Sequence, residues 1–492
     1  MNWIAEWRRR WRTGAVVAVI GLGLPHCAPV RPYQMPESPE IQDTAFIAVE
    51  NPRIRTGEPV AKWWTEFEDA DLLRLIDRSM AHNHDVRQAL ARVREARALS
   101  RASGFDRYPT ATSNLSATRE RASKESLTGD FFDPEYSSYS LGLSASWELD
   151  LFGRVSQGIA AAEAGEGFSN ADLADTQVVV AGEVGMAYMG LRGAQYRLDV
   201  ARRNVANQQQ TYDMIRDLAE GGRSSDLDVV RAEALLSQTR AAMAPLEAEI
   251  DRNLNRLAVL TGQAPAALRE DLSQVRPLPS LPASVDVGDP ASLLRRRPDI
   301  RRAERGLARV SAQYNLEATD IFPRVSILGS LGFLATNFSN LLSSDAVTYS
   351  IGPSIDWAAF DLGRQRAEAE AADARVEGAL AAYEQTVLLA LEDVDTALSA
   401  FAREEQRRQE LQVAARASAR AVELARLRFD AGLDSFLDFL DAERTLLNAE
   451  QALAESEVGV ATRLVTVYKA LGGGWNIAPE DATGEGAATP GE

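Results

Sequence analysis

Few residues in this chain could carry catalytic or metal chemistry. It holds three histidines and one cysteine, and only His82 and His84 follow that cysteine. Because these histidines are two residues apart, they cannot share a helix face as metal ligands. No glycine-rich phosphate loop stands between a strand and a helix. These observations argue against an enzyme and predict neither a metal nor another cofactor.

Carboxylates at recurring positions are the other chemical signal. Ser435 is followed three residues later by Asp438, and Ser225 is followed by Asp228 in the same way. This spacing at the start of a helix predicts a capping box. Asp441 comes next, but the earlier stretch has Arg231 at the matching position. A capping box can therefore explain Asp228 and Asp438, whereas it does not require Asp441.

The two stretches belong to an internal repeat, and finding a repeat decides the fold class before any single motif does. Gly222 and Gly432 are 210 residues apart, and the same shift superposes many more pairs. They are Trp147 and Trp357, Gly153 and Gly363, Ser225 and Ser435, Leu227 and Leu437, Asp228 and Asp438, Ala232 and Ala442, and Glu233 and Glu443. Upstream the shift becomes 214, as for Pro109 and Pro323. The body of the chain is therefore one unit used twice, and each tip is a helix that ends at a glycine before a capped helix.

Each copy contains a β-hairpin with one apolar face. Apolar side chains alternate with serine, glycine and threonine in residues 139–149 and 347–357, and partner strands begin after Pro109 and Pro323. An apolar face opposite a small, uncharged face is typical of a transmembrane barrel. Four strands cannot close a barrel, and lipid does not tolerate open edges, so several chains must contribute strands. We expect one set to face lipid (Tyr139, Leu141, Leu143, Val347, Tyr349 and Ile351) and another to face the lumen (Ser140, Gly142, Ser350 and Gly352).

Long helices connect the hairpins to the tips. Residues 155–220 and 365–431 have helical composition, and the second stretch contains no proline. A continuous helix of that length spans ~100 Å, which is typical of extended coiled-coil packing. Returning helices are expected at 226–261 and 436–471, with a kink at Pro245 in the first.

The N-terminus predicts export. Four arginines between positions 8 and 12 precede an apolar run too short to span a membrane, so residues 1–26 are expected to be a signal peptide. Leu24, three residues before Cys27, resembles a bacterial lipoprotein signal, in which the mature chain begins at a lipid-modified cysteine. Pro25 and His26 replace the small residues of that pattern, and an unmodified Cys27 is the alternative.

The predicted organisation follows from these features. It comprises a signal peptide (1–26), an extended arm (27–68), repeat 1 (69–262, β-hairpin about 108–149), a linker (263–290), repeat 2 (291–473, β-hairpin about 322–357) and a disordered tail (474–492). The net charge of −18 argues against nucleic acid as a partner, because neutralising phosphates requires clustered Lys and Arg.

These motifs together resemble the TolC-like outer membrane efflux proteins, specifically the lipoprotein branch that serves resistance–nodulation–division pumps. The resemblance covers about 27–473. Its carriers are Cys27, Pro32 and Tyr33, Trp63, Trp64 and Phe67, Trp147 with Phe152, Gly153 and Arg154, Arg296 to Ile300, Phe322 and Pro323, and Gly432 with Leu440, Asp441 and Ala442.

The resemblance implies a mainly α-helical fold with a transmembrane β-barrel. Three chains form a twelve-stranded barrel in the outer membrane and a helical tunnel through the periplasm. The implied partners are two more copies, a periplasmic adaptor protein, an inner-membrane pump and outer membrane lipid, with Cys27 carrying palmitate. Family gate residues match Asp438 and Asp441, and Leu437 matches an apolar constriction. We rank Asp441 first, Leu437 second and Asp438 third, with Arg231 and Asp228 as possible gate partners.

Two other functions fit part of the sequence. A channel for protein secretion keeps the architecture and changes the pump, and the lipoprotein start favours efflux over it. A structural coiled-coil lipoprotein explains the helices and Cys27, but not two lipid-suited hairpins at matching positions.

Overall fold

The computed structural model describes residues 31–36, 46, 52–121, 123 and 135–475. Cys27, the predicted signal peptide and most of the predicted tail lie outside these residues. The described chain is mainly helical and divides into two compact units. Unit 1 comprises the described residues of 1–36, 93–169 and 303–383, and unit 2 comprises those of 37–92, 170–302 and 384–492.

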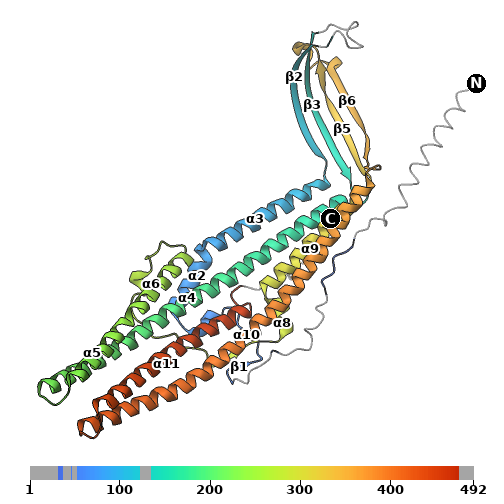
Figure 1. The fold of residues 1–492 in the computed structure, drawn as a ribbon. Coiled ribbons are helices and arrows are strands. Elements are labelled where there is room, and N and C mark those ends of the chain that lie inside the picture. Colours follow the sequence, from blue (N-terminus) through green and yellow to red (C-terminus); the bar gives the residue numbers. More distant parts are fainter. Residues whose placement is uncertain (1–30, 37–45, 47–51, 122, 124–134, 476–492) are drawn as a thin grey trace, which may run out of the picture. The chain divides into compact units, whose positions relative to one another are not determined.

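Unit 1 contains a four-stranded antiparallel sheet in the order β2–β3–β5–β6 (Figure 1). The strands are β2 (Thr110–Arg121), β3 (Glu135–Leu149), β5 (Arg324–Ala335) and β6 (Val347–Asp356). Each repeat contributes one hairpin, and the pairing of β3 with β5 joins the two hairpins. The predicted pair of hairpins is therefore present as one sheet.

The strand register sorts the side chains by polarity. Leu141 lies opposite Leu115 and Phe333, while Gly142 lies opposite Asn114 and Gly332. Because successive side chains point to opposite faces, one face carries the bulky apolar residues and the other the small polar ones. The polar face includes two direct hydroxyl–hydroxyl hydrogen bonds, Ser116 with Ser140 at 2.7 Å and Ser330 with Ser350 at 2.8 Å.

Four helices pass from one unit into the other: α3 (His84–Gly104), α4 (Arg154–Glu220), α9 (Pro298–Thr319) and α10 (Leu362–Asp430). The two longest, α4 with 67 residues and α10 with 69, coincide with the predicted long helices to within three residues at each end. Among the described residues, no helix is both long enough and apolar enough to cross a membrane.

Unit 2 holds the remaining helices. They are α2 (Ala70–His82), α5 (Asp226–Ala241), α6 (Met243–Leu260), α7 (Arg269–Leu272), α8 (Pro290–Arg296) and α11 (Phe436–Ala470). The predicted kink appears as the break between α5 and α6. It lies before Pro245 because the proline ring clashes with the carbonyl four residues earlier, that of Ala241.

The core of unit 2 is built around Trp63. This side chain lies in a short 3-10 helix, η1 (Trp63–Phe67), and is fully buried. Its ring stacks on Tyr468 of α11 with centroids 5.6 Å apart, and Phe67 packs edge-on against it. Gly185 of α4 allows this approach, because a Cβ there would lie 2.5 Å from the indole. The end of the arm is therefore anchored in the helical core.

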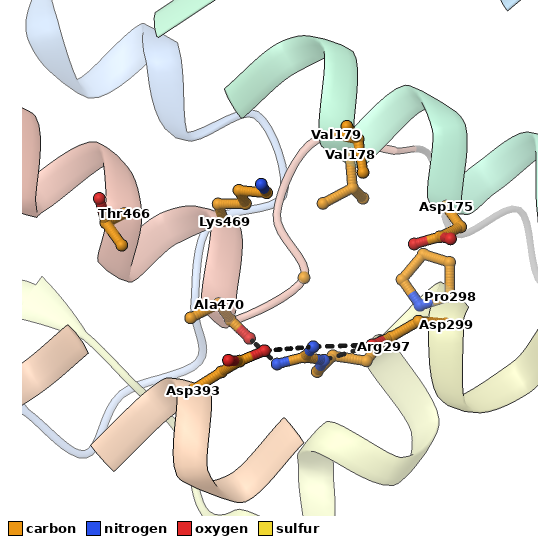
Figure 2. A pocket seen from close by; sticks show the side chains of 11 residues that line it. Asp175, Val178, Val179, Arg297, Pro298, Asp299, Asp393, Thr466, Lys469 and Ala470 are labelled. Carbon is orange, nitrogen blue, oxygen red and sulfur yellow. Dashed lines mark hydrogen bonds and ion pairs between the residues drawn. The ribbon is translucent and has the colours of Figure 1, made fainter. Parts of the chain in front are cut away.

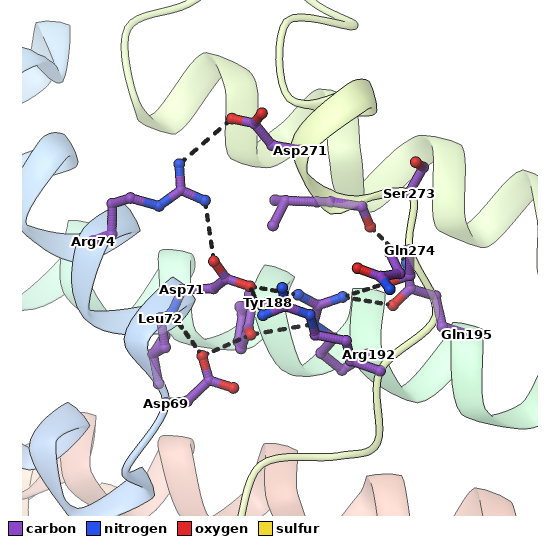
Figure 3. A network of polar contacts seen from close by, with 12 residues as sticks. Asp69, Asp71, Leu72, Arg74, Tyr188, Arg192, Gln195, Asp271, Ser273 and Gln274 are labelled. Carbon is purple, nitrogen blue, oxygen red and sulfur yellow. Dashed lines mark hydrogen bonds and ion pairs between the residues drawn. The ribbon is translucent and has the colours of Figure 1, made fainter.

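A buried ionic network ties α2 and the linker to α4 (Figure 3). The guanidinium of Arg192 is 1% exposed and donates to Asp71 at 2.9 Å, to Gln195 and to the backbone of Gln274. Asp71 also accepts from Arg276 at 2.7 Å. The Asp71 carboxylate therefore neutralises the buried Arg192 and also binds Arg276 of the linker (263–290).

We predict that Asp71→Ala destabilises unit 2 by about 3–5 kcal/mol, because it leaves Arg192 buried without its counter-ion. The matched control is Asp271→Ala, since Asp271 pairs with Arg74 at 3.5 Å where both side chains are about half exposed. Its cost is expected to stay below about 1 kcal/mol. Urea unfolding of the purified protein measures both, and equal losses for the two variants contradict the prediction.

Candidate functional site

The candidate site lies at the two helical tips, the α4–α5 turn (first tip) and the α10–α11 turn (second tip). Both turns have the same backbone geometry. Gly222 has φ +73° and Gly432 has φ +68°, the left-handed region that favours glycine. In each turn the residue after the glycine donates to a carbonyl five residues earlier, Arg223 to Leu218 at 2.8 Å and Leu433 to Arg428 at 2.9 Å. The sequence repeat is thus a repeat of one helix-ending motif.

Capping boxes start both returning helices. The Ser435 hydroxyl accepts from the backbone N–H of Asp438, and the Asp438 carboxylate accepts from the backbone N–H of Ser435 at 3.1 Å. Ser225 and Asp228 make the same reciprocal pair. Asp228 and Asp438 are therefore both engaged in caps, which accounts for their presence without a further role.

Asp441 lies outside the cap. Its side chain is 60% exposed and pairs with Arg444, one helical turn later, at 2.5 Å. Leu437 is exposed on the same helix, and Arg231 of α5 pairs with Asp228 at 3.7 Å. The structure brings Arg231, Leu437 and Asp441 together, because all three line one cavity of about 290 Å³ between α5 and α11.

The sequence predicted Arg231 as a possible gate partner of Asp441. In the structure the two residues face the same cavity within one chain, and each already has a partner on its own helix. Arg444 was not among the predicted site residues, although its spacing from Asp441 is a usual helical ion-pair spacing.

Aromatic packing and an ion pair stabilise the second tip. Phe436 and Phe439 are buried, and the ring of Phe429 stacks on Phe439 with centroids 6.0 Å apart. Across the turn, Arg428 donates to both oxygens of Asp434, at 2.6 and 2.8 Å. Those hydrogen bonds hold the pKa of the Asp434 carboxyl below its ordinary value. Leu437 and Asp441 are thus presented from a firmly held helix start.

A second charged cavity lies away from the tips, near the C-terminal end of α11 (Figure 2). It has about 270 Å³ and contains Arg297, which donates to Asp299 at 2.7 Å and to Asp393 of α10 at 3.0 Å. Arg297 also donates to the backbone carbonyls of Ala390 and Ala470. Since these bonds use the guanidinium fully, the arginine joins helices rather than offering a free charge.

The histidines that follow Cys27 do not form a metal site within the described residues. His82 ends α2 and His84 begins α3, so the two histidines lie on different helices. Within residues 31–36, 46, 52–121, 123 and 135–475, no three His, Cys, Asp or Glu side chains are grouped so as to hold a metal ion. Cys27 lies outside these residues.

Comparisons with known proteins agree on one family. The family model described as "Outer membrane efflux protein" matches residues 75–263 and 290–473. Outer membrane protein OprJ of Pseudomonas aeruginosa is 30% identical over 466 residues, which cover 94% of this chain and 96% of OprJ. The solvent efflux pump outer membrane protein SrpC of Pseudomonas putida is 33% identical over 431 residues, covering 86% of this chain and 89% of SrpC.

Solved structures give the same result. The outer-membrane channel OprN superposes with a TM-score of 0.85 at 40% identity, covering 91% of this chain and 100% of that one. The open state of the MtrE outer membrane channel of Neisseria gonorrhoeae superposes with a TM-score of 0.78 at 29% identity, covering 91% of this chain and 98% of that one.

Proposed function

This chain belongs to the outer membrane efflux protein family, and we propose that three copies of it form the outer membrane channel of a tripartite efflux system. The fold is that of the TolC-like outer membrane channels, as predicted. Efflux through the outer membrane is the function of this family. The chain acts as a conduit and performs no chemistry on its cargo.

The two-faced sheet is the observation that carries the proposal. One face presents Leu, Ile, Val, Tyr and Trp side chains that are exposed in the single chain, including Tyr349 and Ile351 at 80% each. The opposite face presents mostly serine, threonine and glycine, without a charge at its centre. An apolar outside and a small polar inside are what a water-filled barrel in lipid requires.

The sheet edges support a closed assembly of several copies. β2 and β6 are the outer strands, and each has a pairing partner on one side only. An unpaired strand edge is not tolerated in hydrocarbon, so β6 of one copy must pair with β2 of the next. β2 and β6 run antiparallel to one another, and copies joined in this way form an all-antiparallel barrel. Three copies give the even number of twelve strands.

We predict opposite outcomes for arginine at two adjacent positions of β3. Leu141→Arg puts a charge on the lipid face and is expected to cost about 2–4 kcal/mol, while Ser140→Arg on the lumen face costs much less. Denaturant-induced unfolding from lipid vesicles measures the difference. Equal tolerance of both substitutions is incompatible with a lipid-facing sheet.

We propose that the tips form the periplasmic gate, with Asp441, Leu437 and Asp438 contributed by each copy. Threefold symmetry turns Asp441 into a ring of like charges that attracts cations. Its ion pair with Arg444 is exposed on both sides, and exposed pairs are weak, so the carboxylate remains available to a cation. The apolar side chain of Leu437 forms the constriction beside that ring, and the caps of Asp228 and Asp438 hold both helix starts.

We predict that Asp441→Ala raises the divalent cation concentration for half-block of the channel by about tenfold, equivalent to ~1.4 kcal/mol of lost attraction. Arg444→Ala is the matched variant with the opposite sign, since it frees the carboxylate and strengthens block. Conductance of purified trimers in planar bilayers measures both. Unchanged block in Asp441→Ala, together with altered block in Asp438→Ala, reverses the ranking of the two carboxylates.

We also propose that Cys27 is lipid-modified and anchors the arm to the outer membrane. Arg31, four residues later, is held on α9 by two hydrogen bonds between its backbone and the Asn315 side chain, at 2.9 and 2.8 Å. Tyr33 donates to Glu304 of the same helix at 2.6 Å. Both contacts lie within unit 1, which also contains the four-stranded sheet.

We predict that mass spectrometry of the membrane fraction finds a mature N-terminus at Cys27 with acyl groups attached. An intact peptide that continues from residues 20–26 through an unmodified Cys27 contradicts this proposal. Cys27→Ala is expected to remain in the membrane, because the strands themselves hold it there, provided that its signal is removed elsewhere.

The implied partners follow from the assembly. We propose a periplasmic adaptor protein at the tips and an inner-membrane pump that supplies the cargo. The relatives OprJ and SrpC carry outer membrane and efflux-pump names, which supports efflux over protein secretion. Co-purification of the trimer with an adaptor encoded nearby is the direct test.

A further inference from the structure

A polar layer interrupts the apolar packing between α4 and α11. Close to the tips, Ile215 of α4 packs with Phe436 and Phe439 of α11. Further along the helices, away from the turns, the buried side chains of α4 are polar instead: Asn204, Gln208 and Thr211. They line a cavity of about 350 Å³, which also includes Glu443 of α11 and Arg426 of α10.

Glu443 connects the two tip hairpins through this layer. Its carboxylate accepts from the Thr211 hydroxyl at 2.8 Å and from the Gln208 amide at 3.3 Å, while its side chain is buried. Both donors belong to the hairpin of α4 and α5, whereas Glu443 belongs to the hairpin of α10 and α11. A single carboxylate thus bonds one hairpin to the other, two residues beyond the proposed gate residue Asp441.

The layer is incompletely bonded. The side-chain nitrogen of Asn204 and the side-chain oxygen of Gln208 are buried and make no hydrogen bond to any other described residue, although both residues line the cavity. Buried polar groups without partners weaken packing, and a polar layer in a coiled coil reduces its stability. The two hairpins therefore separate here at lower cost than at the apolar cluster or along the helices beyond.

Arg426 offers Glu443 a second partner. It lies on α10, in the same hairpin as Glu443, and lines the same cavity without forming an ion pair with it in this arrangement. Its positive charge favours the ionised carboxylate. If the hairpins part, Thr211 and Gln208 move away with α4, while Arg426 stays with Glu443. The carboxylate has one set of partners for each arrangement.

The repeat shows that this layer is not a general requirement of the hairpin. Glu233 occupies the position of Glu443 in the first copy and is exposed. The positions that match Asn204, Gln208 and Thr211 hold Ala414, Ser418 and Ala421. The polar layer therefore exists on one side of the duplication only.

We propose that Glu443 positions the gate-bearing helix α11 by exchanging partners, Thr211 and Gln208 in the packed tip and Arg426 in the parted tip. This inference rests on the proposed channel function. Because Asp441 and Glu443 lie on the same helical turn, the exchange moves the gate carboxylate together with α11.

The exchange makes the gate depend on pH. Burial is the main cause that raises the pKa of the Glu443 carboxyl above its ordinary value of 4.5, against the opposing effects of its hydrogen bonds and Arg426. Arg426 is the only charged side chain that faces it from α10, and the α4 side chains in the cavity are uncharged. Since the packed arrangement binds the proton more tightly, acidic pH favours it. That advantage is lost as the pH rises through the raised pKa.

Single-channel recordings of purified trimers in planar bilayers test the exchange. Thr211→Ala removes a partner of the packed state and is expected to raise the open probability by about tenfold, because hydrogen bonds to charged groups are strong. Arg426→Ala removes the partner of the parted state and is expected to lower it. Glu443→Gln keeps the shape but cannot titrate, so it lowers opening and removes part of the pH dependence. The matched control, Glu233→Gln, is expected to leave both unchanged.

The decisive result is that Thr211→Ala raises the open probability while Arg426→Ala lowers it. A merely structural role predicts that Thr211→Ala and Arg426→Ala both loosen the tip and both raise conductance, and that outcome overturns the exchange. A wild-type pH profile in Glu443→Gln overturns it as well. A heat-resistant trimer on gels controls for folding of every variant. If wild-type trimers form no channels, the proposed function fails; if they conduct but the variants lack opposite signs, only the exchange fails.

Discussion

The unpaired backbone of the two outer strands is the constraint on which the rest of the structure depends. Inside one chain β3 and β5 have partners on both sides, while β2 and β6 have one each. Each unbonded N–H or C=O in hydrocarbon costs several kcal/mol, so the sheet is stable in a membrane only as part of a larger closed sheet. The two hairpins give each chain an even number of strands in this sheet, so the outer strands run antiparallel and can pair with those of another copy. Each long helix follows a strand of this sheet in the chain: α4 follows β3, and α10 follows β6.

The long helices are also joined to other segments by ion pairs that are not part of the repeated motifs. Arg192 and Asp71 join α4 to α2, and Arg297 and Asp393 join the start of α9 to α10. Each pair includes a buried guanidinium whose charge is neutralised in place. Such pairs contribute little net stability over an apolar contact, but breaking one is costly. They therefore act mainly by fixing which helices lie together.

The two copies differ at positions proposed for the gate. The tips share their glycine turns and capping boxes, so those features serve folding in both copies. Asp441 corresponds to Arg231 in the repeat, and buried Glu443 corresponds to exposed Glu233. Because the same turn forms with either Asp441 or Arg231 at this position, the turn geometry does not require a carboxylate there.

The sequence by itself determined the elements that depend on residues close together in the chain. The hairpins follow from alternation, the long helices from composition, and the tips from Gly222, Gly432 and the Ser-x-x-Asp caps, because each is stabilised by bonds within a few residues. The requirement for several chains also followed from the strand count alone.

Only the tertiary structure decided which distant residues meet. Nothing local distinguishes Glu443 from Glu233, since burial depends on which helix face α4 covers. Likewise Arg231 and Asp441 come to one cavity, and Arg297 meets Asp393, through packing between helices far apart in the chain. Periodicity predicts that a face is buried, but the partner on that face depends on the packing of whole helices, which no short stretch of sequence encodes.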